Sequence, residues 1–206
     1  MEPSEKPLGE LCLDLANTLR WHASDHPLET LTGYADLLSW ARDKGALSPG
    51  EAGALLELSR ADEAASRKVY ARAIELREAI YGIVVDQLRH RNSRDEFLKP
   101  INRELELAHR HLQLAQAGQS FQWTWSGEQL DLPLWQVARS AAELLTSPEL
   151  LARLGQCADD RGCGWLFIDW SKNHSRRWCD INDCGNRAKQ RRHYLKARTA
   201  SGDSSE

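Results

Sequence analysis

The sequence predicts a mainly α-helical protein: a helical N-terminal domain with one small β-hairpin, followed by a C-terminal treble-clef-like module that contains four cysteines. Apolar residues recur every three or four positions through most of the first 150 residues, which is the period of amphipathic helices. Four of the five cysteines form two pairs near the C-terminus, where positive charge is also concentrated. We therefore expect a helical domain over residues 1–150, a cysteine module over 151–198 and a disordered tail over 199–206.

The helical period marks seven segments of the first domain. In chain order they are residues 8–21, 29–44, 49–58, 62–91, 94–117, 133–145 and 147–154. Capping boxes begin two of them, at Ser48-Pro49-Gly50-Glu51 and at Ser93-Arg94-Asp95-Glu96. Gly45 and Gly118 are expected to end helices, and Pro100 is expected to kink one or to delay its start.

A short hairpin is expected between the last long helices. Phe121, Trp123 and Trp125 alternate with polar residues, as in a half-buried strand, and residues 129–132 offer the second strand after a turn at Ser126-Gly127-Glu128. The aromatic face would suit either base stacking or packing as a lid on the helical core. The alternation favours packing on the core.

Polar residues interrupt the apolar face of the first helix. Asp14, Asn17 and Thr18 lie at positions i, i+3 and i+4, on one side of an otherwise apolar segment. They would line a cavity that binds a small effector, or they would pair with the backbone of a neighbouring element, as buried polar groups normally do. Both interpretations stay open from the sequence. Cys12, on the apolar face, is expected to be a core thiol.

The paired cysteines predict one structural zinc ion. Cys157 and Cys163 are separated by five residues, and Cys179 and Cys184 by four, with fifteen residues between the pairs. Two pairs of thiols that are joined by a short insert suit a tetrahedral four-thiolate site. Residues 164–170 read as a strand, residues 171–175 as a turn and residues 176–178 as a returning strand, followed by a basic helix after Cys184. The module is thus predicted to be a treble-clef-like four-cysteine zinc finger.

The same segment resembles a known family. The string Cys163-Gly164-Trp165-x-Phe167-x-Asp169-x-Ser171-x-Asn173-x-x-Arg176-Arg177-Trp178-Cys179, followed by Cys184-Gly185-Asn186-Arg187, is similar to the CGNR zinc fingers of bacterial proteins. Proteins with this finger usually carry an N-terminal helical ABATE domain, and residues 11–18 resemble its Leu-Asp-x-x-Asn-Thr signature. The resemblance implies a stress-related transcription regulator.

Charge is divided unevenly along the chain. The net charge is −3, but residues 1–150 carry −7 and residues 151–206 carry +4, with nine basic and two acidic residues within 172–198. An acidic body with a basic end is typical of a protein that contacts nucleic acid through that end, although charge runs are usually solvated faces. The arginines that we expect to contact nucleic acid are Arg176, Arg177, Arg187, Arg191, Arg192 and Arg198. For Arg187 a role inside the finger, on carbonyl groups or Asp169, is an equal alternative.

Several classes of function are not supported by the sequence. It has no glycine-rich phosphate loop, no serine nucleophile elbow and no HExxH motif. A zinc ion closed by four thiolates has no open position for catalysis, so we expect no enzyme. We expect a cytoplasmic protein, since the sequence has neither a signal peptide nor an apolar run long enough to span a membrane.

The leading hypothesis is a transcription regulator that binds duplex DNA through the finger. Its helical domain would sense a small molecule or mediate dimerisation. The alternative is a protein-interaction or RNA-binding adaptor that uses the basic finger.

Overall fold

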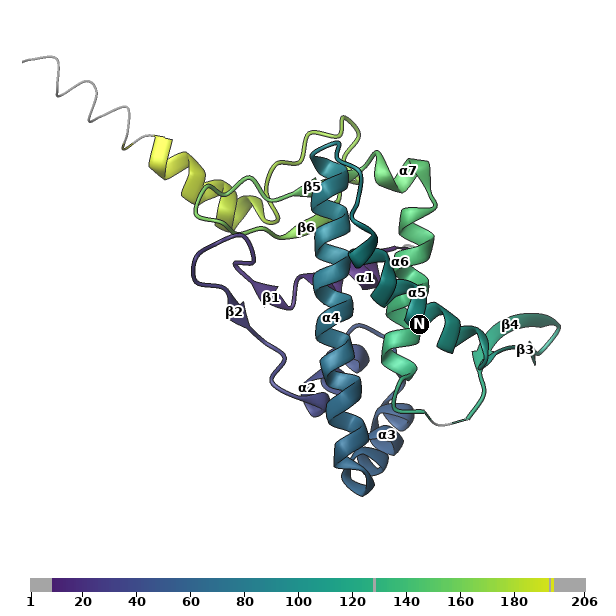
Figure 1. Cartoon of the computed structure of the whole chain (residues 1–206). Helices are drawn as coiled ribbons and strands as arrows, with labels where there is room; N and C mark the ends of the chain where they lie inside the picture. Colours follow the sequence, from purple (N-terminus) through teal and green to yellow (C-terminus); the bar gives the residue numbers. More distant parts are fainter. Residues whose placement is uncertain (1–8, 128, 193, 195–206) are drawn as a thin grey trace, which may run out of the picture.

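The structure is a computed structural model that describes residues 9–127, 129–192 and 194. It is mainly helical, as predicted, with three two-stranded antiparallel sheets. Figure 1 shows the long helix α4 at the centre, with the finger near one of its ends and α3 near the other. The helices are α1 (Glu10–Ala16), α2 (Tyr34–Asp43), α3 (Pro49–Ala61), α4 (Glu63–Leu88), α5 (Asp95–His109), α6 (Leu132–Leu145) and α7 (Pro148–Leu151). None of the helices in this described part has the length and apolar character needed to cross a membrane.

The hydrophobic core lies where α1, α4, α5 and α6 meet. Leu15 of α1, Leu76 of α4 and Trp135 of α6 are at most 1% exposed. Burial of large apolar side chains is the main stabilising contribution to such a bundle. α5 also brings in a buried carboxylate, Glu104, which forms ion pairs with Arg72 and Arg103.

Local sequence signals set several helix ends as expected. Ser48 and Glu51 form the predicted capping box at the start of α3, and Gly45 follows α2 with a φ of 73°. The second predicted box does not form, because α5 starts at Asp95 after Arg94, which makes no side-chain cap. Pro100 is accommodated within the first two turns of α5.

The first helix is shorter than its apolar period predicts. α1 ends at Ala16, and β1 (Leu19–Arg20) then pairs with β2 (Leu28–Glu29) in a segment that was expected to be helix and loop. The hydroxyl of Thr18 donates to the carbonyl of Leu15 at 2.7 Å, which satisfies a terminal group of the helix. The helix thus ends at its C-cap Asn17 before its apolar pattern stops.

The aromatic hairpin exists, but the expected partner strand is wrong. β4 (Ser120–Trp125) pairs with β3 (Leu112–Ala117), which precedes it, and Gly118 begins the connecting turn with a φ of 62° instead of ending a helix. Trp125 packs against the core, whereas Phe121 is 73% and Trp123 is 54% exposed. The expectation that this aromatic face is buried therefore holds only at the base of the hairpin, which projects from the body in Figure 1.

The finger also pairs its strands differently from the prediction. β6 (Leu166–Ile168) lies in the expected strand, but its partner is β5 (Leu154–Gln156), which comes before the first cysteine. Residues 176–178 form no strand, because Asp169 accepts hydrogen bonds from the backbone N–H groups of Ser171 and Arg176 and so shapes a turn. A wide helical turn, η1 (Ile181–Gly185), carries Cys184, and an α-helical segment follows over residues 186–192.

Candidate metal centre and basic surface

Four thiols that are far apart in the sequence converge in the finger. The Sγ atoms of Cys157, Cys163, Cys179 and Cys184 all lie within 4.8 Å of one another. Cys163 and Cys179 are 3.8 Å apart and Cys179 and Cys184 are 3.5 Å apart, so no disulfide joins them. A tetrahedral zinc–thiolate site with Zn–S bonds of about 2.3 Å has edges of about 3.8 Å. The four thiols therefore fit one zinc ion.

Two backbone features bring the pairs together. The N–H of Cys157 donates to the carbonyl of Trp165 at 2.8 Å, which folds the first pair over the start of β6. Asp180 caps η1 by accepting from the N–H groups of Asn182 and Asp183, which fixes the turn that carries Cys184. The short spacers thus form two tight turns whose thiols face each other.

The protonation of the cluster favours a bound cation. The hydrogen bond from Cys163 lowers the pKa of the Cys157 thiol to about 5, while burial raises the pKa of Cys184 to about 12 and also raises that of Cys179. One thiolate forms readily, but further negative charges at this separation repel each other. A divalent ion holds all four as thiolates. Because four thiolates close the coordination shell, such a zinc ion is structural and leaves no position for a substrate.

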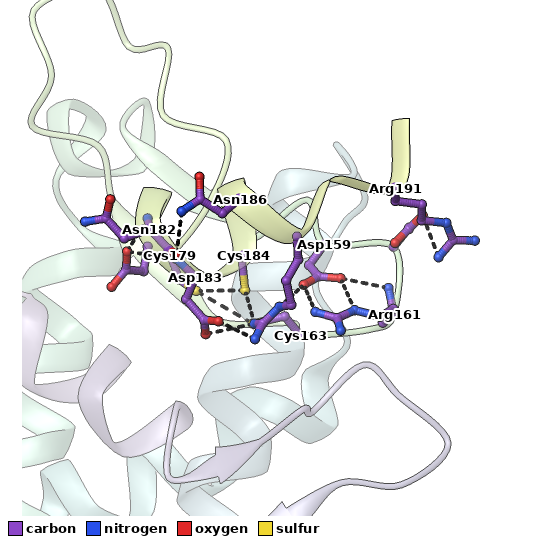
Figure 2. A network of polar contacts seen from close by, with 12 residues as sticks. Asp159, Arg161, Cys163, Cys179, Asn182, Asp183, Cys184, Asn186 and Arg191 are labelled. Atoms are coloured by element: carbon purple, nitrogen blue, oxygen red, sulfur yellow. Dashed lines mark hydrogen bonds and ion pairs between the residues drawn. The ribbon is translucent and has the colours of Figure 1, made fainter. Parts of the chain in front are cut away.

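The guanidinium group of Arg187 lies directly beside the four thiols. Its Nη2 atom lies 3.1 Å from Sγ of Cys184 and 2.8 Å from a carboxylate oxygen of Asp183. Asp159 lies 3.6 Å from its Nε atom and also binds Arg161, so the two arginines and the carboxylate form one network beside the thiols (Figure 2). The structure thus supports the role inside the finger for Arg187, with Asp159 and Asp183 as partners instead of Asp169.

The helical domain also contacts the two arginines beside the thiols. The guanidinium groups of Arg161 and Arg187 lie 5.2 Å and 5.3 Å from the ring centre of Trp21, which follows β1. Gly162 and Gly164 adopt φ values of 84° and 69° next to Ala23, where a Cβ atom on either would approach Ala23 backbone within 2.8 Å. The sequence did not indicate that Trp21, Asp159 and Arg161 lie beside the cysteine cluster. The pattern Asp-Asp-Arg-Gly inside the first cysteine spacer was the available signal for the last two.

Arg176 is exposed, but it also binds backbone groups of the finger. Its Nε atom donates to the carbonyl of Trp178 at 3.0 Å, and its Nη2 atom donates to the carbonyl of Cys179. The same guanidinium lies 4.3 Å from the ring centre of Phe167. These contacts hold the second cysteine-bearing turn against β6, so Arg176 and Arg187 both have structural partners.

The remaining described arginines of the set lie together at the surface. A groove of about 150 Å³ separates the first cysteine-bearing turn from the final helix. We call it the arginine groove, and it is lined by Ala158, Asp160, Arg177, Trp178, Ala188, Arg191 and Arg192. Arg191 forms an exposed ion pair with Asp160, at 3.0 Å. Arg198 lies outside the described residues.

Comparison with known protein families agrees with this architecture. Residues 9–148 match the model of the ABATE family, whose description reads "Putative stress-induced transcription regulator". The chain belongs to the ABATE family. Residues 153–197 match the model of the CGNR zinc finger, which spans all four clustered cysteines. No curated protein matches the chain. Neither family is one of enzymes.

The polar residues of the ABATE signature have partners in the structure. Asn17 binds the backbone of Leu166 in β6, Thr18 binds the carbonyl of Leu15, and Asp14 forms an ion pair with Lys44 at 2.8 Å. Asp14 and Asn17 also border a cavity of about 160 Å³ between α1 and β6, whereas Thr18 does not line it. The structure thus brings two of the three predicted ligand-binding residues to a cavity at the contact between the two matched regions.

Proposed function

We propose that this protein is a transcription regulator that binds duplex DNA through its finger. The observation that supports this function is the division of the arginines: Arg176 and Arg187 hold the finger together, while Arg177, Arg191 and Arg192 lie together on its exposed surface. Exposed arginines on a rigid support suit the phosphates of a duplex, because guanidinium groups bind phosphate oxygens with good geometry.

The finger is supported by the helical domain and does not stand apart from it. β5 packs against α4 and β6 packs against α1, so the basic surface has a fixed position relative to the body. We infer that the body positions the finger and that a small molecule in the cavity beside Asp14 and Asn17 modulates that position. Such a cavity lies where a ligand would alter the contact between α1 and β6.

The test uses the full-length zinc-loaded chain and a labelled duplex of mixed sequence. Fluorescence anisotropy is expected to show binding that weakens steeply as salt rises, since phosphate contacts release counterions. A genome-wide binding map is then expected to show defined sites. If the chain does not bind the duplex even at low salt, the proposal is contradicted.

One observation favours a second candidate, a protein-interaction function that uses the β3–β4 hairpin and not the basic finger of the adaptor alternative. The tip of the β3–β4 hairpin exposes Leu114 (64%), Phe121 (73%) and Trp123 (54%), and exposed apolar clusters often mark protein contacts. A protein partner would then dock on the hairpin. Trp123→Ala is expected to abolish such an association and to leave DNA affinity unchanged.

A further inference from the structure

The arginine groove has the size and charge of a site for one phosphate group. Its three arginines and one aspartate leave a formal charge of +2 in a space of about 150 Å³. A cavity of about this volume accommodates a molecule of the size of benzene, whereas drug-sized ligands need roughly 300 Å³ or more. A single phosphate fits this groove better than a whole nucleotide does.

Contacts within the finger hold one wall of the groove in place. The N–H of Ala158 donates to the carbonyl of Arg177 at 2.8 Å, which ties the first cysteine-bearing turn to the segment before Cys179. The guanidinium of Arg177 lies 5.2 Å from the ring centre of Trp178. The opposite wall is the helical segment 186–192, in which the small side chain of Ala188 leaves the groove open. A site assembled from three segments of a zinc-fixed module needs little reorganisation to bind its ligand.

Arg191 is the residue that would have to change partner. Its ion pair with Asp160 joins side chains that are 53% and 58% exposed. An exposed pair of this kind contributes at most about 1 kcal/mol, so a phosphate can replace the carboxylate at small cost. A phosphate also offers more acceptor oxygens, and arginine binds it in a bidentate manner.

We propose that the arginine groove binds one phosphodiester group of a nucleic-acid backbone, and that Arg191 exchanges its ion pair with Asp160 for that phosphate. The inference rests on the proposed function and assigns its central contact. Asp160 thereby acts as an internal competitor that occupies Arg191 in the unbound protein and lowers affinity for the backbone. Arg177 and Arg192 supply the other contacts, from opposite walls of the groove.

The test removes the charge of Asp160, which competes with the phosphate for Arg191. Asp160→Asn in the full-length zinc-loaded chain is expected to raise affinity for a labelled duplex about two- to fivefold in 0.15 M salt, because the ion pair that must be broken is lost. The matched control is Glu57→Gln, which removes one charge from another exposed pair, with Arg60 on α3, at the far end of α4 from the finger (Figure 1). The control is expected to change affinity little, since a remote exposed charge is screened. Zinc content measured for each variant confirms that the finger is intact.

The same assay identifies the source of the phosphate. Arg192→Ala is expected to weaken duplex binding about fivefold at this salt concentration. Sodium phosphate is expected to compete with the duplex better than sodium chloride at equal ionic strength, and Arg192→Ala is expected to remove this difference. Tight binding of a mononucleotide that the duplex does not displace would instead assign the groove to a small phosphorylated ligand and overturn the proposal.

The outcomes distinguish phosphate binding in the groove from DNA binding by the chain as a whole. If the chain binds duplex DNA but Asp160→Asn behaves like Glu57→Gln, the groove is not the phosphate site, and the proposed function still stands. If the chain binds no duplex at all, the proposed function and the inference both fail. An increase of affinity in Asp160→Asn alone supports the exchange.

Discussion

The side-chain amide of Asn17 forms a pair of hydrogen bonds with the backbone of Leu166. Its Nδ2 atom donates to the Leu166 carbonyl at 2.9 Å, and the Leu166 N–H donates to Oδ1 at 2.8 Å. Asn17 lies at the C-terminal end of α1 and is 6% exposed, while Leu166 begins β6 of the finger and is 1% exposed. The edge of β6 is thus completed by a side chain of the helical domain, in the way that another strand would complete it.

The first prediction concerns this pair. Asn17→Ala is expected to lower the free energy of unfolding by roughly 2–4 kcal/mol, because it leaves a buried donor and a buried acceptor without partners. Urea denaturation of the zinc-loaded chain measures this loss. Asn92→Ala, at an exposed loop position, is the matched control and should change stability by less than about 0.5 kcal/mol. Equal stabilities for the two variants would contradict a role for Asn17 in joining the two regions.

The second prediction concerns the metal. We expect one zinc ion per chain by elemental analysis, and none in Cys179→Ser, because a tetrahedral site that loses a thiolate binds zinc far more weakly. Cys12→Ser is the control: the Cys12 thiol donates to the carbonyl of Gly9, far from the cluster in sequence, and a hydroxyl can make the same bond. It should retain the full zinc content. Native protein without zinc would refute the site.

The third prediction concerns the reactivity of Cys12. Burial raises the pKa of its thiol from 9.0 to about 12, which reduces the thiolate fraction at pH 8 about a thousandfold. After zinc is chelated, iodoacetamide should modify the four finger thiols and leave Cys12 unmodified, as mass spectrometry would show. The same treatment in denaturant should modify all five. Because its pKa in the folded protein is so high, the Cys12 thiol is still almost fully protonated at pH 9. Raising the pH from 7 to 9 should therefore leave Cys12 unmodified while the helical domain remains folded.

The fold class could be predicted because the core of the helical domain follows one periodic pattern. Leu76, Ile80 and Ile83 of α4 lie at helical spacing and are at most 3% exposed. The errors arose where a short polar side chain overrides the pattern. Thr18 forms a hydrogen bond to the last turn of α1, where the helix ends. The Asn17 side-chain amide binds a strand residue that lies 149 positions later in the chain, a contact that no local pattern reveals.

The hairpin shows a second limit. Leu105, Ala108 and Leu112 continue the helical period of α5 into β3, while Leu112 and Leu114 also fit the alternation of a strand. Gly118 suits both a helix end and a hairpin turn. Only the cross-strand pairing of Leu114 with Trp123 distinguishes the two, and this pairing is a property of the folded chain.

The candidate site was predictable in part. Close pairing of four cysteines identified the metal centre, because the ligand spacing is itself the geometric requirement. Which arginines bind the finger itself was not predictable, because Arg176 and Arg187 differ from Arg191 only in the groups that surround them in three dimensions. Arg187 and Arg191 are four residues apart, which is the same face of a helix, so helical spacing does not distinguish them.

The fourth prediction separates the two kinds of arginine. Arg187→Ala is expected to weaken zinc binding about 10- to 100-fold, as loss of a group that supports a metal ligand usually does, because its guanidinium contacts the Cys184 sulfur. Competition with a colorimetric chelator measures this change. Arg192→Ala, in the same helical segment but on the groove, should leave zinc affinity unchanged. A similar loss in both variants would show that the two arginines do not differ in role.

The last prediction concerns the dependence of DNA binding on salt. In the inferred contact the arginine groove holds one phosphate, so it should account for about 0.9 of the magnitude of the slope of log affinity against log salt concentration, and any steeper slope comes from phosphates contacted elsewhere. Arg177→Ala and Arg192→Ala, which both act on this one phosphate, should each flatten the slope by at most about one unit, with zinc content unchanged. Arg60→Ala, which removes an exposed charge from α3, should leave the slope as it is. A slope that responds to Arg60 as strongly as to Arg192 would mean that DNA attaches to the charge of the whole surface and not to the finger.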